Sequence, residues 1–276
     1  MIRLLVDSSA DFSKAEIEEK KLLFVPLQVT IEDKNYLDGI DIMQDEFYEK
    51  LTKEEIFPKT SLPNLYEIEK KVKEYLKEGY QVIILPLSKE ISGTYSALVS
   101  MMEEYENVRV IDTLTTICGL RFLVNEALKL EVDNLDELEI KLCNLQKRIR
   151  IIAGIDTLEY LYKGGRLTKT ASLVGNVIGL KPLISVIDGK VVVLAKRRGR
   201  KHAMQYVLDK FQTSNIDYNY PIYGIYSMNK MNCQELYNAL TDEKLRRAVQ
   251  NYENIAPVIG CHVGPGAYGF VFIDKE

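Results

Sequence analysis

The sequence predicts an α/β protein built from two domains of ordinary size. Along the first half, short apolar runs, polar loops and amphipathic segments alternate at the spacing of βαβ units, which is typical of a mostly parallel sheet flanked by helices. The second half contains Asp188-Gly189 between two apolar runs, a strong hairpin signal, so we expect an α/β domain with antiparallel strands there. The chain has 276 residues, 46% of them hydrophobic, enough for a substantial core.

A strand, a polar loop and a helix open the chain. Ile2 to Val6 is apolar and gives way to a polar cluster, and Ser13 and Glu16 have the spacing of a capping box. Apolar positions at helical spacing over 64–78, followed by Gly79, predict an amphipathic helix. The same patterns predict strands at 81–87 and 108–112 and helices at 93–105, after residue 116 and at 134–148.

A new strand at 150–156 follows, so we place the domain boundary near residue 150 and expect domains at 1–150 and 151–276. Residues 168–180 are rich in small and apolar residues and predict a closely packed helix, with Gly175 and Gly179 one turn apart. Further strands are expected at 183–187, 191–195, 220–226 and 267–273. The basic run over 196–202 is interpreted as a solvated face.

Composition excludes several classes of protein. The formal net charge of -4 is a poor match for nucleic acid, so no nucleic-acid partner is expected. Four scattered cysteines without a C-x-x-C pair argue against a zinc site or a disulfide framework and fit reduced thiols in the cytoplasm. The N-terminus becomes acidic at Asp7, and no uncharged run approaches membrane-spanning length. We therefore expect a cytoplasmic protein without a metal and without stable membrane insertion.

His262 lies in the most informative segment, which runs from Gly260 through Gly264 to Gly266. Glycines on both sides allow positive φ angles and close approach to a ligand, and an imidazole supplies a donor that titrates near neutrality. A tight turn with a surface histidine before the last strand is the alternative.

Two further segments place hydroxyl groups where an anion would bind. Ser92, Gly93 and Thr94 follow a predicted strand and begin a helix, where free amides and the helix dipole favour a carboxylate or phosphate. Ordinary helix capping is the alternative for Ser92, and it is the stronger one for that residue alone. Thr60-Ser61 precedes Leu62-Pro63, where a turn is sufficient explanation.

Most enzyme motifs are absent. The run 264–269 satisfies G-x-G-x-x-G, but a strand-like segment follows it where a dinucleotide site requires a helix. No phosphate loop, H-E-x-x-H helix or G-x-S-x-G elbow occurs. A triad of Ser92, His262 and an aspartate such as Asp7 remains as a second hypothesis, and it would make the protein an acyl-ester hydrolase.

Six segments in order resemble the DegV family of bacterial fatty-acid-binding proteins over essentially the whole chain. They are Val6 to Asp11, Lys59 to Pro63, Leu87 to Tyr95, Val110 to Thr113, Leu161 to Leu167 and His262 to Gly266. The resemblance implies two α/β domains that hold a long-chain fatty acid between them, without chemistry or a cofactor of their own. It also implies a partner, an ATP-dependent fatty acid kinase subunit that converts the presented acid to an acyl phosphate.

Transferred to individual residues of this sequence, the resemblance implies positions that contact the carboxylate, the acyl tail and the kinase. The carboxylate would lie at Thr60, Ser61, Ser92, Gly93, Thr94 and His262, the acyl tail against Leu27, Val29, Leu173, Val177 and Ile178, and the kinase at Arg166 and Arg198. Leu62 stands where many relatives have glutamine, and Ser9 where threonine is common. The preferred chain length and saturation, the oligomeric state and the identity of the kinase stay open.

Overall fold

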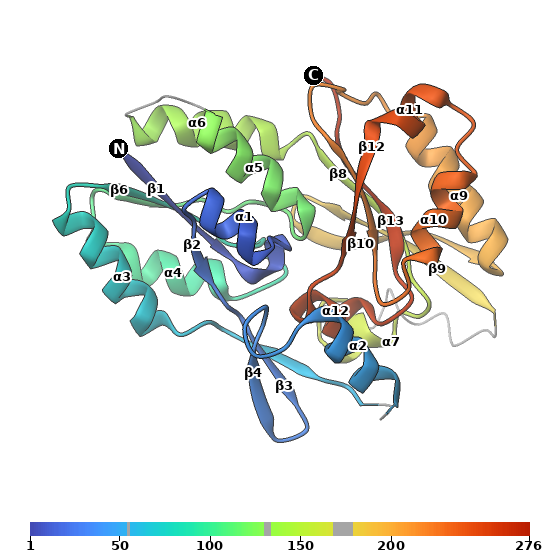
Figure 1. The fold of residues 1–276 in the computed structure, drawn as a ribbon, viewed down its shortest axis with the longest axis horizontal. Coiled ribbons are helices and arrows are strands. Elements are labelled where there is room, and N and C mark those ends of the chain that lie inside the picture. Colours follow the sequence, from blue (N-terminus) through green and yellow to red (C-terminus); the bar gives the residue numbers. More distant parts are fainter. Residues whose placement is uncertain (54–55, 130–133, 168–178) are drawn as a thin grey trace.

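The structure is a computed structural model that describes residues 1–53, 56–129, 134–167 and 179–276. Two larger sheets stand next to each other, and a smaller three-stranded sheet lies near their junction (Figure 1). The first sheet is built from the N-terminal half of the chain and the second from residue 149 onward. The structure is therefore the mixed α/β fold that the sequence predicts.

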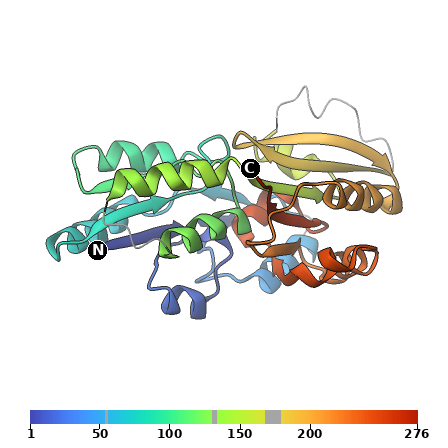
Figure 2. The ribbon, with the colours of Figure 1, turned by 90° about the horizontal axis from the view of Figure 1, so that it is seen from above.

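The first sheet is parallel throughout and has the order β2-β1-β6-β7. Its strands are β1 (Ile2–Asp7), β2 (Leu23–Val25), β6 (Gln81–Leu85) and β7 (Val108–Val110). Because side chains alternate along a strand, Leu5 faces one hydrophobic cluster with α3 (Leu65–Lys77) and α4 (Thr94–Met102), whereas Leu4 and Val6 face another with α5 (Cys118–Lys129). α6 (Leu135–Gln146) packs on α5. Figure 2 shows these helices on both sides of the strands.

The second sheet has the order β10-β9-β8-β13-β11-β12, and only β11 and β12 in it are parallel. Its strands are β8 (Ile149–Gly154), β9 (Leu180–Ile187), β10 (Lys190–Arg198), β11 (Ile222–Tyr226), β12 (Val249–Asn254) and β13 (Tyr268–Ile273). One face is covered by α9 (Arg200–Gln212), α10 (Met231–Asn238) and α11 (Glu243–Ala248). The other face carries Ile151, Ile184 and Val271 into the same hydrophobic cluster as Leu4 and Val6. A single core thus joins the two halves of the chain.

The small sheet supports the junction. It consists of β3 (Gln28–Ile31), β4 (Lys34–Leu37) and β5 (Lys59–Ser61), all antiparallel. Three helices complete this region: α2 (Gln44–Lys53), α7 (Glu159–Lys163) and α12 (Pro257–Val263). Figure 1 places all three below the junction of the larger sheets. The Tyr48 hydroxyl of α2 donates to the carbonyl of Ile255 at 2.9 Å, which ties the N-terminal half to the start of α12.

Arg121 of α5 forms a second link between the halves. Its side chain is 4% exposed and contacts Glu16 of α1 (Lys14–Glu19) at 2.6 Å and Glu253 of β12 at 2.8 Å. The guanidinium also donates to the carbonyls of Ala10 and Asp11, next to the short 3-10 helix Ser8–Ala10. One buried cation therefore holds three segments that are distant in the sequence.

The described elements confirm most of the sequence predictions. The capping box joins Ser13 and Glu16, and Asp188 and Gly189 form the predicted hairpin turn with φ values of 49° and 78°. One interpretation was wrong, because Lys59–Ser61 is a strand and not a turn. The basic run 196–202 spans the end of β10 and the start of α9, and none of its residues is buried, as expected of a solvated face. The domain boundary near residue 150 stays a prediction, close to the start of β8. Most of the predicted helix at 168–180 lies outside the described residues.

Candidate functional site

A polar pocket forms where β5, the start of α4 and α12 meet. Five of the six predicted carboxylate contacts line it: Thr60, Ser61, Ser92, Gly93 and His262. The remaining lining residues are Leu27, Leu62, Leu87, Ile91, Arg166, Val258 and Ile259. The space between these atoms is about 600 Å³, part of it open to solvent. The structure therefore brings together most of the predicted polar residues, from segments distant in sequence.

Ser92 lines the pocket and lies one residue before Gly93, the N-cap of α4. Its Oγ accepts from the backbone N–H of Thr94 at 3.2 Å and lies 2.9 Å from the Thr94 hydroxyl. Thr94 itself is fully buried and is not among the residues that line the pocket. Ser92 therefore bonds the first amide of α4 without occupying the N-cap position, and its side chain is also part of the pocket lining. The free amides at the start of α4 add positive potential there.

His262 lies on a helix, α12, and not in the glycine-rich turn that the sequence suggested. Only Gly264 of the flanking glycines has a positive φ, 76°, where it ends the helix. The His262 Nε2 lies 2.9 Å from the Thr60 hydroxyl, whereas Nδ1 is buried and has no hydrogen-bond partner among the described residues. We assign the proton to Nε2, because this tautomer avoids burying an unpaired N–H. His262 then donates to Thr60 and leaves the threonine proton free for an anion.

Burial also determines the charge of His262. Desolvation, and then the nearby charge of Arg166, lower its pKa to about 3. The expectation that this imidazole titrates near neutrality was therefore wrong. The ring is therefore neutral at physiological pH, and any positive charge of the polar pocket comes from another lining residue.

Arg166 supplies that charge. It lines the polar pocket, where its Nε donates to the carbonyl of Ile91 at 2.9 Å and its Nη1 to the carbonyl of Gly164. No carboxylate forms an ion pair with it in the described part of the chain. An arginine stays protonated at any physiological pH. Arg166, which the resemblance assigned to kinase docking, thus presents an unpaired cation to the pocket, whereas Arg198 is exposed and lines neither pocket.

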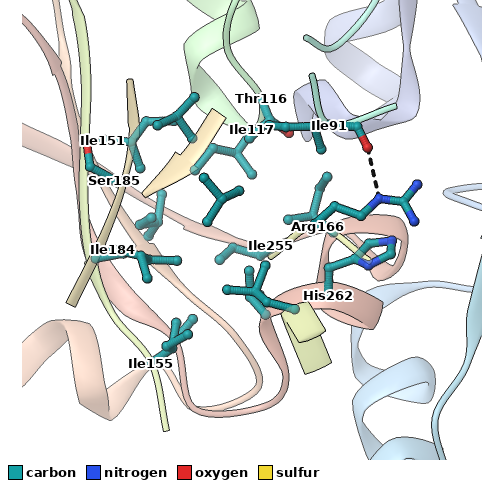
Figure 3. A pocket seen from close by; sticks show the side chains of 18 residues that line it. Ile91, Thr116, Ile117, Ile151, Ile155, Arg166, Ile184, Ser185, Ile255 and His262 are labelled. Atoms are coloured by element: carbon teal, nitrogen blue, oxygen red, sulfur yellow. Dashed lines mark hydrogen bonds between the residues drawn. The ribbon is translucent and has the colours of Figure 1, made fainter. Parts of the chain in front are cut away.

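A second pocket, almost entirely apolar, adjoins the first and is the one drawn in Figure 3. The space between its lining atoms is also about 600 Å³, including the part open to solvent. Its apolar lining is Ile91, Ile117, Ile151, Ala153, Ile155, Leu161, Ile184, Val186, Val191, Ile225, Ile255, Ile259, Val263 and Ala267. Four residues, Ile91, Arg166, Ile259 and His262, line both pockets. The polar and the apolar pocket are therefore adjacent and share one wall.

Most of this apolar lining was missed from the sequence. Of the predicted tail contacts, Leu27 lines the polar pocket, Val29 is buried in the core and lines neither pocket, and Leu173, Val177 and Ile178 lie outside the described residues. Five of the lining isoleucines come from strands of the second sheet or the loops beside them, whereas Ile91 and Ile117 come from the N-terminal half and Ile259 from α12. Their inward alternation on β8 was the available signal, since Ile151 and Ala153 share one face of that strand.

The hydrolase hypothesis finds no support in the hydrogen bonds. Ser92 bonds Thr94, and His262 bonds Thr60, so no described bond connects the two. Asp7 accepts from Ser9 and from the backbone N–H of Leu87, and burial raises its pKa to about 6. A histidine with a pKa near 3 is also a weak general base at neutral pH.

The described residues include no group of three or more histidine, cysteine or acidic side chains that would hold a metal ion. Among the same residues, no helix combines the length and the apolar character needed to cross a bilayer.

The amino-acid sequence matches a known protein family and individual relatives over almost its whole length. A family model described as "Uncharacterised protein, DegV family" matches residues 1–275. A DegV domain-containing protein of Clostridium acetobutylicum is 32% identical over 287 aligned positions, which cover 99% of each chain.

Two similar solved structures are of proteins described as binding fatty acids. The fatty-acid-binding DegV family protein of Streptococcus agalactiae is 28% identical and has a TM-score of 0.88, with 100% of this chain and 99% of that chain covered. A stearic-acid-binding protein of Eubacterium ventriosum is 26% identical and has a TM-score of 0.85, with the same coverage. Proteins of this fold and similarity therefore include fatty-acid-binding ones.

Proposed function

The chain belongs to the DegV family, and on that premise we propose that it binds a long-chain fatty acid between its two halves. The carboxylate lies in the polar pocket near Thr60, Ser92 and Arg166, and the acyl tail lies in the apolar pocket. The protein does no chemistry of its own in this proposal.

One observation carries the proposal: a polar pocket, in which the Arg166 cation has no carboxylate partner among the described residues, shares a wall with an apolar pocket. Arg166 and His262 belong to both linings, so they stand where a head group would join its tail. Figure 3 shows both side chains on one side of the apolar space, with Ile151, Ile155 and Ile184 on the other. A ligand that fits both spaces must have an anionic end and an extended apolar end, which is the chemistry of a fatty acid.

The two pockets contribute differently to the binding free energy. Burying each methylene contributes about 0.8 kcal/mol, so a tail of a dozen carbons contributes about 10 kcal/mol, within the range of the association cost of about 4–15 kcal/mol, and a longer tail contributes more. Hydrogen bonds from Ser92 and Thr60 to a charged carboxylate contribute about 1.5–3 kcal/mol each. The apolar pocket therefore supplies most of the affinity, and the polar pocket determines the orientation of the acid.

We further propose that the oriented carboxylate is presented to an ATP-dependent fatty acid kinase subunit, which forms the acyl phosphate. The polar pocket is partly open, as phosphoryl transfer to a bound carboxylate requires. Arg198 is exposed, and in this proposal it contacts the kinase, while Arg166 acts inside the pocket. Four free cysteines fit a reducing compartment, so we place this function in the cytoplasm.

Native mass spectrometry of the protein made in bacteria tests the binding. We expect the wild type to carry a fatty acid, and Ser92→Ala to bind added oleate about tenfold to a hundredfold more weakly. Ser100→Ala, an exposed serine on the same helix, is the matched control and binds as the wild type does. The proposal is wrong if no acid co-purifies and Ser92→Ala binds oleate normally.

The kinase step has its own test. With a bacterial fatty acid kinase and ATP, the Arg198→Ala protein is expected to bind oleate normally and to yield acyl phosphate several times more slowly. Equal rates for Arg198→Ala and wild type would contradict the assigned role of Arg198. Failure of any kinase to phosphorylate acid bound to the wild type would contradict the presentation itself.

A further inference from the structure

One hairpin supplies the most exposed part of the apolar pocket wall. Val186 of β9 and Val191 of β10 form a cross-strand pair, and both line the pocket. Among the apolar lining residues, only these two and Val263 are not buried. In Figure 2 the gold β9–β10 hairpin reaches from the second sheet toward the green helices of the N-terminal half. The hairpin therefore forms part of the boundary between the pocket and solvent.

The outer part of this hairpin projects beyond the main sheet. β9 pairs with β8 only at Leu183 and Ile184, and beyond Ile184 it pairs with β10 alone among the described residues. β10 has a bulge between Val193 and Ala195, opposite the same two residues of β9. A bulge interrupts the ladder of hydrogen bonds and lets a strand bend. Residues 185–193, which we call the hairpin arm, therefore have both irregularities at their base.

The tip of the hairpin arm contacts the N-terminal half at a single turn. The hydroxyl of Ser88, which is fully buried, donates to the carbonyl of Gly189 at 2.9 Å. Gly189 is buried as well, whereas its neighbours Asp188 and Lys190 are exposed. Lys190 Nζ also lies 3.5 Å from Glu90 Oε2, but an ion pair so open to solvent contributes little. Among the described residues, the bond between Ser88 and Gly189 is therefore the main polar attachment of the tip.

Ser88 also belongs to the turn that carries residues of both pockets. Its backbone carbonyl accepts from the N–H groups of Ile91 and Ser92, both at 3.0 Å. Ile91 lines both pockets, and Ser92 lines the polar one. One residue thus connects the tip of the hairpin arm to the turn that forms part of the head-group site.

We propose that the hairpin arm is a flap that opens to admit the acyl tail, and that the bond between Ser88 and Gly189 is the latch that holds it closed. This inference rests on the proposed fatty-acid binding and adds the route by which the tail enters. The hairpin arm bends where β9 leaves β8 and at the facing bulge, so Val186 and Val191 move away from the pocket together. Segments with few buried contacts open locally at low cost in free energy. A bound tail packs against the same two valines and favours the closed arm.

A reversible disulfide across the latch tests this inference. A Cβ at Gly189 would lie 3.4 Å from the Cβ of Ser88, close to the separation of about 3.8 Å that disulfides prefer. The double variant Ser88→Cys/Gly189→Cys also carries Cys143→Ser, because Cys143 is the one native cysteine that is not buried. Diamide closes the disulfide and dithiothreitol opens it in the same protein. Entry and release of the fluorescent fatty acid cis-parinarate are followed by stopped flow, with both single cysteine variants as controls.

A closed disulfide is expected to slow entry and release by about tenfold or more without changing the dissociation constant, because a locked flap hinders passage in both directions. Dithiothreitol should restore both rates, and the single variants should not respond to diamide. Ser88→Ala, which needs no disulfide, should speed entry and release by about threefold to tenfold through loss of the latch bond. Ser100→Ala, an exposed serine on α4, is its matched control and should exchange the acid as the wild type does.

The inference is overturned if the double variant exchanges the acid equally fast with the disulfide closed and open, once its formation is verified by mass. If the disulfide does not form, Ser88→Ala decides, and rates equal to those of Ser100→Ala overturn the inference. If the wild type does not bind cis-parinarate at all, the proposed function fails, and the flap with it.

Discussion

A methyl group added at Gly164 should displace the imidazole of His262 without altering its chemistry. A Cβ at this position would meet His262 Nδ1 at 2.1 Å and Cε1 at 2.8 Å, against an ordinary contact of 3.4 Å or more. Gly164 has φ -75° and ψ -7°, which alanine adopts freely, so the ring must move. A shift of the ring on this scale breaks the 2.9 Å bond between His262 Nε2 and the Thr60 hydroxyl.

Overpacking of this kind lowers the free energy of unfolding by about 1–3 kcal/mol, and a lost hydrogen bond contributes about 0.5–1.5 kcal/mol. We therefore expect Gly164→Ala to be less stable by about 1–3 kcal/mol in urea unfolding and to bind oleate up to tenfold more weakly. His262→Ala removes the ring with which the new methyl group collides, so the double variant should equal His262→Ala alone. Additive effects of the two substitutions, or an unchanged Gly164→Ala protein, would refute the account of how His262 is held.

Three further predictions follow from groups near the site and the junction. Arg166→Gln should weaken oleate binding at least tenfold, because it removes the positive charge beside the carboxylate, and should leave binding of the corresponding fatty alcohol unchanged. Both affinities are measured by ligand displacement. Equal losses of affinity for the two ligands would contradict an electrostatic role of Arg166. The His262 pKa is lowered from 6.5 to about 3, so the unfolded chain binds a proton at pH values where the folded one does not, and stability falls as pH drops through this window. Between pH 6.5 and 5, the free energy of unfolding of the wild type should therefore fall by about 1.6 kcal/mol relative to that of His262→Asn, because the unfolded histidine is half protonated at pH 6.5 and almost fully protonated at pH 5. The buried carboxyls with raised pKa affect both proteins alike. A constant difference between the two proteins would contradict a neutral His262. Arg121→Met leaves Glu16 and Glu253 unpaired and should lower the free energy of unfolding by about 3–5 kcal/mol, and a loss under 1 kcal/mol would show that the pair is dispensable.

The sequence predicts those parts of the structure whose causes are local. Ser13 and Glu16 bond each other within one turn, and Asp188 and Gly189 take the two positive φ values that a tight hairpin requires. The strands β1, β6, β7 and β8 follow from apolar runs bounded by polar loops. These features depend on neighbours in the chain, so composition and spacing are sufficient to find them.

Features that depend on distant contacts were missed. Gly260 suggested a turn, but it lies within α12, where a side chain would collide with Phe47 and Tyr48 of α2 at under 3 Å. Pro257 at the first turn of α12 was a signal for the helix, because proline favours that position.

The lowered pKa of His262 and the location of the apolar pocket both depend on contacts between residues that are distant in the sequence. Burial by residues far away in the chain lowers the pKa of His262, and no spacing near the histidine indicates it. The apolar lining runs from Ile91 to Ala267, and its members meet only when the two sheets are assembled. Ser92 was found because its hydroxyl follows a predicted strand and begins a helix, and Thr60 because it lies in a short polar segment before Leu62-Pro63, which is local information.

The most direct test is a crystal structure of the protein with a fatty acid that carries bromine near the end of its chain. Anomalous scattering then locates the tail independently of the head group. We expect the bromine between Ile151 and Ile184 and the carboxylate within hydrogen-bond distance of Thr60 and Ser92. Bromine in the polar pocket beside Arg166, or bound acid outside both pockets, would contradict the account.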